Sequence, residues 1–179
     1  MIMSPRLRKF ALAAHLVFSV GWIGTVMAYL ALGVTARTSP DDQTLRAAWI
    51  AMELIGWYVI VPLALASLLT GLVMAFGTKW GLFRHYWVMI SLFLTIIAVV
   101  VLLFHMPDVS VLAAAAREAE GAGLDGLGEH LYAQLAEGDL LHPSLGLVVL
   151  LVIQVLNVYK PQGVTRYGRR ASSKSVASE

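Results

Sequence analysis

Three side chains of metal-binding type lie near the outer ends of apolar segments of the chain: Glu53, His105 and His142. A carboxylate inside an apolar segment is costly unless it is paired or protonated, and two imidazoles at the same depth would pair with it. The same three side chains could bind a divalent transition metal such as zinc or copper, or handle protons. The alternative is that each lies at a water interface and is simply solvated.

A second polar group is centred on His15, the one side chain of the first apolar run that titrates near neutral pH. On a helix, His15 shares a stripe with Ser19 and Trp22, and this stripe should face protein because lipid favours apolar groups. The imidazole could hold the iron of a haem b, could centre a polar pocket, or could simply join two helices by a hydrogen bond. The expected cofactor-binding residues are His15, His85, Trp22, Gln154 and Asn157.

We expect His15 to face the bundle interior and to contact a polar group on the third or fourth span, where Gln154 and Asn157 lie at matching depth. Unpaired ring nitrogens in hydrocarbon would cost about 1–3 kcal/mol. His85 and His105 lie about 200° apart around one helix, so both cannot point inward. The alternative for His85 is a position among the lipid head groups.

Composition indicates a single small membrane domain: 59% of the 179 residues are hydrophobic, 13% are charged and the mean hydropathy is +0.76. The chain has no cysteine, which excludes disulfides and thiolate metal sites. No phosphate-binding loop, nucleophile elbow or dinucleotide fingerprint is present, and nothing supports nucleic-acid binding. We predict an all-α membrane protein, a bundle of four transmembrane helices, with spans at about 10–33, 49–76, 84–105 and 140–159.

The distribution of lysine and arginine predicts that both termini are cytoplasmic in a multi-pass protein of the cell inner membrane. The outer loop, 106–139, should hold two short helices, at 109–120 and 129–137, and its His130 should be solvated. Residues 168–179 read as a disordered basic tail that follows a four-helix domain at 1–167. Pro62 should kink the second span.

The spacing His15-x6-Trp22-x-Gly24 resembles the start of small bacterial membrane proteins of the copper-resistance protein D type, and of the membrane-type protoporphyrinogen oxidase. The segments ELIGWYVIVPLALASLLTG, WGLFRHYWV and VYKPQGVTRYG resemble an actinobacterial family of predicted integral membrane proteins of unknown function. The first resemblance implies haem, porphyrin or copper chemistry, whereas the second implies no activity.

Three functions follow, and the sequence leaves open whether the chain is an enzyme. The first is a haem b or porphyrin protein with His15 as principal ligand and a membrane redox partner. The second is a metal- or proton-handling protein that uses Glu53, His105 and His142. The third is a non-catalytic subunit of a membrane complex, or a homo-oligomer, with the outer helices as contact surface.

Overall fold

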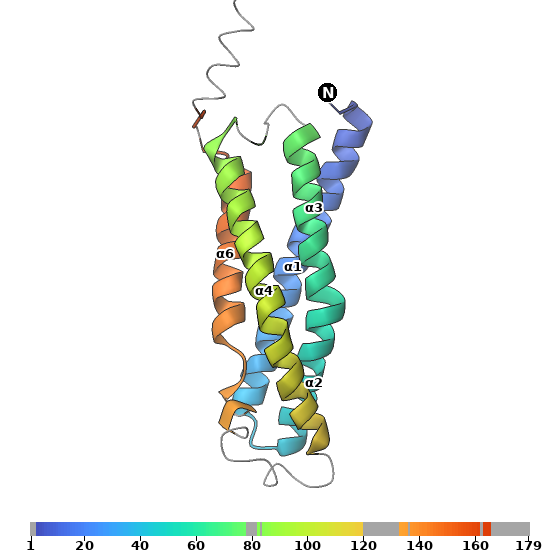
Figure 1. The fold of residues 1–179 in the computed structure, drawn as a ribbon, viewed down its shortest axis with the longest axis vertical. Coiled ribbons are helices and arrows are strands. Elements are labelled where there is room, and N and C mark those ends of the chain that lie inside the picture. The colour runs from blue at the N-terminus through green and yellow to red at the C-terminus, as the bar shows by residue number, and fades with distance from the viewer. Residues whose placement is uncertain are drawn as a thin grey trace, which may run out of the picture.

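Four long helical segments run side by side, alternately down and up, in a computed structural model that describes residues 3–77, 82, 84–119, 133–135, 137–161 and 163–165 (Figure 1). Each segment is long and apolar enough to cross a membrane, which confirms the predicted all-α fold with four spans. The elements are α1 (Pro5–Thr38), α2 (Asp42–Ile55), η1 (Gly56–Ile60), α3 (Val61–Gly77), α4 (Tyr86–Glu118) and α6 (Leu141–Tyr159).

The second segment is one continuous helix, Asp42–Gly77, with a π-turn at η1. The N–H of Val61 donates to the carbonyl of Gly56, five residues back. Pro62 follows directly and has no N–H to donate, so it cannot continue the ordinary α-helical pattern at this point. The disturbance expected at Pro62 therefore lies in the turn that precedes the proline.

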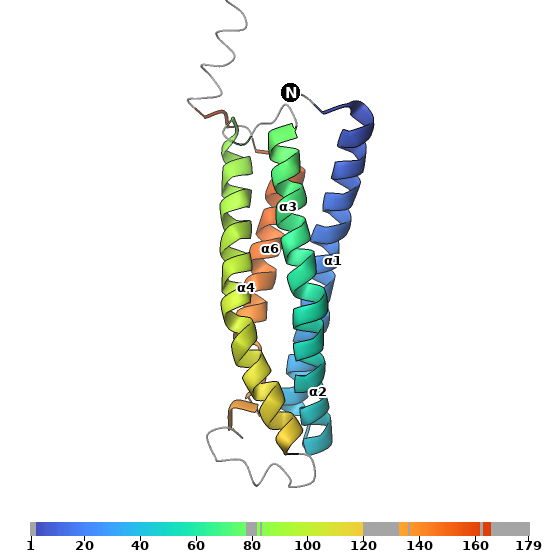
Figure 2. The same cartoon turned by 45° about the vertical axis from the view of Figure 1, so that its right-hand side comes forward.

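The helices differ in length, and this difference divides the molecule into two parts. The 33 residues of α4 extend about 50 Å, whereas the 19 residues of α6 extend about 28 Å, close to the hydrocarbon thickness of about 30 Å. The ends of α1 and α4 and all of α2 therefore continue beyond the start of α6 (Figure 2). We call residues 33–55, 106–119 and the described residues of 133–140 the distal extension.

The outer loop is shorter than predicted, because α4 continues through Pro107 to Glu118. The helix expected at 109–120 is therefore the end of α4 and not a separate element. Burial explains the continuation: Met106 and Val109, on either side of the proline, are fully enclosed. Their contacts compensate for the backbone hydrogen bond that the proline removes.

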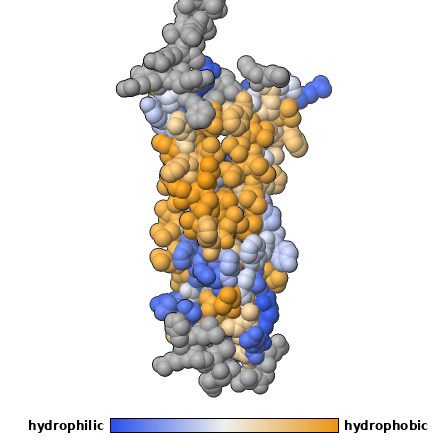
Figure 3. Space-filling view, viewed as in Figure 1, coloured by the Kyte–Doolittle hydropathy of each residue, from blue (hydrophilic) through white to orange (hydrophobic). Residues whose placement is uncertain are grey.

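The distal extension has a core like that of a soluble protein, whereas the rest of the bundle presents apolar side chains outward. The largest fully buried side chains all belong to the extension: Trp49, Met52, Met106, Leu135 and Val109. In the first quarter of α4, by contrast, Phe93 is 64% exposed. Figure 3 shows a broad apolar band between hydrophilic residues at the two ends. This surface fits lipid around the band and water around the distal extension.

Short contacts order the ends of the elements. At the N-terminal end of the bundle, an isolated β-bridge joins His85, before α4, to Val164, after α6. At the other end, Asp41 caps α2 by accepting from Thr44, and these hydrogen bonds lower the pKa of the Asp41 carboxyl below its ordinary value. His130, most of the helix predicted at 129–137 and the tail at 168–179 lie outside the described residues.

Candidate functional site

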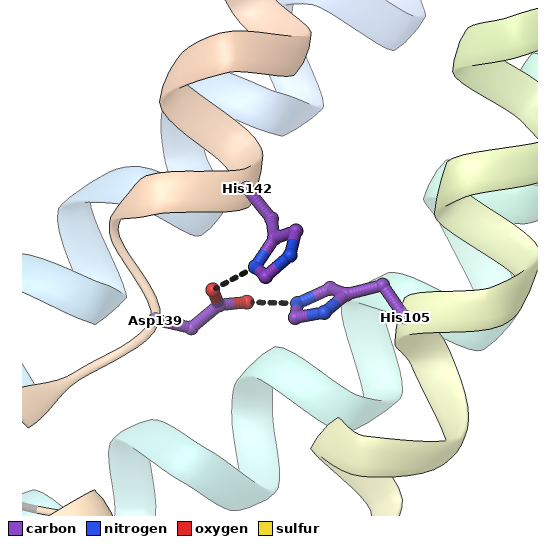
Figure 4. A group of neighbouring side chains, drawn as sticks. All are labelled: His105, Asp139 and His142. Atoms are coloured by element: carbon purple, nitrogen blue, oxygen red, sulfur yellow. Dashed lines mark hydrogen bonds and ion pairs between the residues drawn. The ribbon is translucent and has the colours of Figure 1, made fainter.

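Two histidines and an aspartate meet where α6 begins, and we call His105, Asp139 and His142 the His–Asp–His cluster (Figure 4). Nε2 of His105 lies 2.6 Å from Oδ2 of Asp139, and Nδ1 of His142 lies 4.0 Å from Oδ1. The two imidazole rings stack with their centroids 4.2 Å apart. One ligand atom from each residue falls within 4.8 Å of the others.

The Asp139 carboxylate is buried and accepts a second hydrogen bond. The hydroxyl of Tyr29, on α1, donates to the same Oδ2 atom at 2.7 Å. The side chain of Asp139 is only 6% exposed, and Tyr29 is buried as well. A carboxylate removed from water needs such donors, because an unpaired buried charge is strongly unfavourable.

Two glycines allow the backbone that carries Asp139 to lie against α1. A Cβ on Gly33 would lie 2.7 Å from the carbonyl oxygen of Asp139, closer than real side chains approach. Gly138 has a φ of +65°, in the left-handed region that favours glycine, and a Cβ there would lie 2.5 Å from the carbonyl oxygen of Gly33. The pair therefore fixes how closely this segment packs.

Side chains of α1 and α2 fasten the residues just before Asp139. The indole N–H of Trp49 donates to the carbonyl of Leu135 at 3.0 Å, and Leu135 is fully buried. Nη1 of Arg37 donates to the carbonyl of Glu137 at 3.2 Å. These two hydrogen bonds fix the backbone of the segment before Asp139, so the aspartate is held at a defined position between α1 and α4.

The cluster differs in one member from the predicted trio. Glu53 forms an ion pair with Arg117, within the distal extension. Asp139, and not Glu53, is the acid that lies beside His105 and His142. The available signal was the spacing Asp139-x-x-His142, which places both residues on one side of a helix start.

A narrow apolar pocket of about 250 Å³ adjoins the cluster, and we call it the distal pocket. Its walls come from α1, η1, α4, α6 and the segment just before α6. His105, Asp139 and His142 line one part of it, and Trp22 with Leu150 lines another. A ligand in this pocket would meet hydrocarbon groups and one polar cluster.

A larger pocket of about 370 Å³, the N-terminal pocket, lies toward the start of α1. Its lining includes four of the five residues predicted to bind a cofactor: His15, Trp22, Gln154 and Asn157. Trp22 and Leu150 line both pockets, so these two side chains lie between them.

His15 faces this pocket, but its hydrogen-bonding partner differs from the prediction. Nδ1 of His15 lies 3.0 Å from the hydroxyl of Thr70, which belongs to the second span and not to the third or fourth. Gly71 permits the approach, since a Cβ there would lie 3.2 Å from the imidazole. Close packing of α1 on α3 thus puts Thr70 nearer to the ring than the residues of matching depth on α6.

His85, the predicted second haem ligand, lies apart from this pocket. It precedes α4, its backbone takes part in the β-bridge, and its ring centroid lies 6.4 Å from that of Trp87. His85 is not among the described residues that line the N-terminal pocket. The structure therefore brings His15 together with Trp22, Gln154 and Asn157, but places His85 elsewhere.

Comparison with known proteins gives one match. A profile described as "Predicted integral membrane protein (DUF2269)" matches residues 10–161, which include all of the spans apart from the first turns of α1. No curated protein and no solved structure matches the chain.

Proposed function

We propose that this chain, which belongs to the DUF2269 family of predicted integral membrane proteins, binds a divalent transition metal at the His–Asp–His cluster. Membership fits the four apolar helices and makes the chain a multi-pass protein in contact with lipid. The family has no assigned activity, so the proposal rests on the site. The observation that carries it is the convergence of His105, Asp139 and His142 ligand atoms within 4.8 Å.

Two imidazoles and a carboxylate form a donor set suited to zinc, copper or iron. Three protein ligands on such an ion leave a further coordination position for water or a substrate. An ion would replace the proton shared by His105 and Asp139, so binding should release protons and weaken at low pH. The Tyr29 hydroxyl would keep the carboxylate oriented, as hydrogen-bonding partners of metal ligands do elsewhere.

The same contacts support proton handling as a second candidate. Tyr29, Asp139 and His105 form a continuous chain of hydrogen bonds from α1 to α4. Imidazole and carboxylate groups in such a chain can pass a proton from one to the next. This function needs the same residues but no metal, so measurement of metal binding separates the two.

We further propose that both termini are cytoplasmic and that the cluster lies at the outer surface of the inner membrane. Arg6, Arg8 and Lys9 lie on the first turns of α1, at the opposite end of the bundle from the cluster. This bias is the usual orientation signal of multi-pass proteins. We expect a reporter that works only in the cytoplasm to be active when it is fused to the C-terminus. Activity of a reporter that works only outside the cytoplasm would reverse the proposed orientation.

The test of the metal proposal is stoichiometric binding by the full chain purified in mild detergent. After treatment with a chelator, the protein is titrated separately with Zn²⁺ and Cu²⁺, and retained metal is measured by mass spectrometry. We expect one ion per chain for wild type, none for H105A or H142A, and clearly weaker binding for D139N.

His85, the residue just before α4, provides the matched control. H85A removes an imidazole from the other end of α4, so it should retain full metal binding, and E53Q should do the same because Glu53 pairs with Arg117. Absence of metal from well-folded wild-type protein would overturn the metal proposal and leave proton handling. Equal loss in H85A and H105A would show that binding is nonspecific.

Haem b remains a prediction without support from the arrangement of the described histidines, since His85 does not line the pocket that holds His15. An absorption spectrum of the purified chain, with and without H15A, tests it directly. A membrane redox partner, assembly into a larger complex and homo-oligomerisation also remain predictions, and the distal extension offers the surface on which a partner would act.

A further inference from the structure

We propose that the N-terminal pocket binds an amphipathic molecule with an anionic head group and an apolar body, such as a fatty acid or a lysophospholipid. The head would lie near Arg8 and Lys160, and the body would reach toward Trp22. This site is separate from the His–Asp–His cluster and does not depend on a metal there.

The size and shape of the pocket suit such a molecule. Its volume of about 370 Å³ falls within the range of about 300–1,000 Å³ typical of small-molecule sites. Arg8 and Trp22 both line it and are 14 residues apart on α1, or about 21 Å along the helix axis. The lining comes from α1, α3, α4 and α6, so the pocket follows the axis of the bundle.

The end of the pocket near the N-terminus is cationic. Arg8, from the first turns of α1, and Lys160, directly after α6, both line it. None of the described residues that line the pocket is acidic. Lys160 closes the C-terminus of α6 with a left-handed φ of +46°, and its backbone N–H donates to the carbonyl of Leu156, which fixes where its side chain begins. An anion would be attracted to this pair of charges.

The middle of the pocket offers polar groups to a ligand. The hydroxyl of Thr70 donates to the carbonyl of Ala66 at 2.7 Å, so it must accept from Nδ1–H of His15. His15 itself lines the pocket and would lie beside a ligand bound there. The amides of Gln154 and Asn157 line the same pocket from α6.

The hydroxyl of Ser91 gives an independent indication that the pocket holds a polar ligand atom. Its side chain lines the pocket and the residue is only 6% exposed, yet its hydroxyl has no hydrogen-bond partner among the described residues. Buried hydroxyl groups are normally bonded, because an unsatisfied one is costly. A polar atom of a bound ligand, or a water held with it, would satisfy this group.

The far end of the pocket is apolar. Leu68, Leu150 and Ile153 line it together with Trp22, which also closes it off from the distal pocket. Hydrocarbon placed here would contact these apolar side chains and would fill space that the helices leave open. Charge at one end and hydrocarbon at the other select an amphipathic anion over a simple ion.

The test is photo-crosslinking in vesicles of neutral phosphatidylcholine that contain the full chain. The probe is palmitate carrying a diazirine on its acyl chain, and labelled peptides are located by mass spectrometry. We expect saturable labelling of peptides containing Trp22 or Leu150, above any labelling of the lipid-facing Phe93. Excess palmitate and excess lysophosphatidate, added separately, should show whether a carboxylate or a phosphate competes better.

Charge variants test the head-group contact. R8Q combined with K160N should reduce saturable labelling at least about tenfold, and asparagine is chosen because it tolerates the left-handed conformation. R6Q removes a charge from the same helical turn without touching the pocket, so it should change labelling less than about twofold. The corresponding diazirine alcohol, which has no charge, should label the pocket peptides weakly.

The variant S91A adds a readout that does not depend on surface charge. We expect about fivefold weaker labelling with the thermal unfolding temperature unchanged or slightly raised, because the hydroxyl has no partner within the described part of the chain. Unsaturable labelling spread evenly over lipid-facing peptides would overturn the proposal. Equal labelling by the charged and the neutral probe would also overturn the proposal. This comparison needs only wild-type protein, so it does not depend on whether a variant folds.

Discussion

The two polar regions of this bundle both contain histidine but differ in how their polar side chains are hydrogen-bonded. In the His–Asp–His cluster, polar groups from α1, α4 and the start of α6 bond directly to one another. In the N-terminal pocket, His15 bonds to Thr70, while other polar groups surround a volume of about 370 Å³, and the hydroxyl of Ser91 has no partner among the described residues.

This difference indicates ligands of different size. Side chains that already converge within 4.8 Å leave room for an ion and little else. Polar side chains distributed around a long pocket leave room for a molecule that brings several functional groups of its own. The predictions below therefore ask whether each region can be damaged without the other.

The largest effect is expected from G33V, which would put side-chain atoms where the Asp139 carbonyl now lies, 2.7 Å from a Cβ. Because backbone must move, we expect a loss of about 3 kcal/mol in the free energy of unfolding and no metal binding. The matched control is G24V on the same helix, where a Cβ has nothing within 4 Å. Chemical unfolding and metal titration check both variants, and equal losses would refute the role of Gly33.

The variant Y29F should have the next largest effect, since it removes one of the two donors to a buried carboxylate. We expect about 2 kcal/mol of lost stability and metal binding weakened about tenfold to a hundredfold. Labelling of the N-terminal pocket should not change. Tyr58 is 76% exposed, so Y58F should match wild type in all three measurements.

In the N-terminal pocket, T70V should cost about 1 kcal/mol, because it removes the acceptor for Nδ1 of His15 but keeps the shape of the side chain. Metal binding should stay at the wild-type level. T25V is the control, since Thr25 bonds only to the carbonyl of Gly21 in its own helix. If metal affinity fell in T70V, the two regions would have to be regarded as coupled.

The smallest effect is expected from E53Q, which breaks the ion pair with Arg117. The arginine side chain is 43% exposed, and such pairs contribute about 0.5 kcal/mol. The loss should shrink further at high salt. A large loss of stability together with loss of metal binding would show that Glu53 belongs to the metal site after all.

The four spans were predictable because each is a long apolar run, and the polar layers were predictable because histidines within such runs are rare. The continuation of α4 was not, since Pro107 followed by Asp108 resembles a helix end. What overrides this signal is burial of Met106 and Val109, which depends on packing against α2.

The exchange of Asp139 for Glu53 has a similar cause. Glu53 attracted attention because it lies inside an apolar run, whereas Asp139 looked like one more acid of the outer loop. Its burial comes from Trp49, Arg37 and the close approach at Gly33, contacts made between segments far apart in the sequence. The spacing Asp139-x-x-His142 was a local signal for the pair, but it carries no information about these long-range contacts, so the burial of the aspartate is visible only in the folded chain.

The π-turn at Gly56–Ile60 has a mechanical consequence, because it accommodates one residue more than an α-turn would. Deleting a single residue there would rewind the helix and rotate α3 relative to α2 by about 100°. Thr70 would then swing away from His15, while Trp49 and Met52 could stay in place. The extra residue thus sets the rotation of α3 about the helix axis relative to α2, and with it the orientation of the side chains near the N-terminal pocket relative to those of the distal extension. One continuous helix can therefore pack its α2 part into the core of the distal extension and its α3 part into the lipid-surrounded bundle, although the two parts bury different faces.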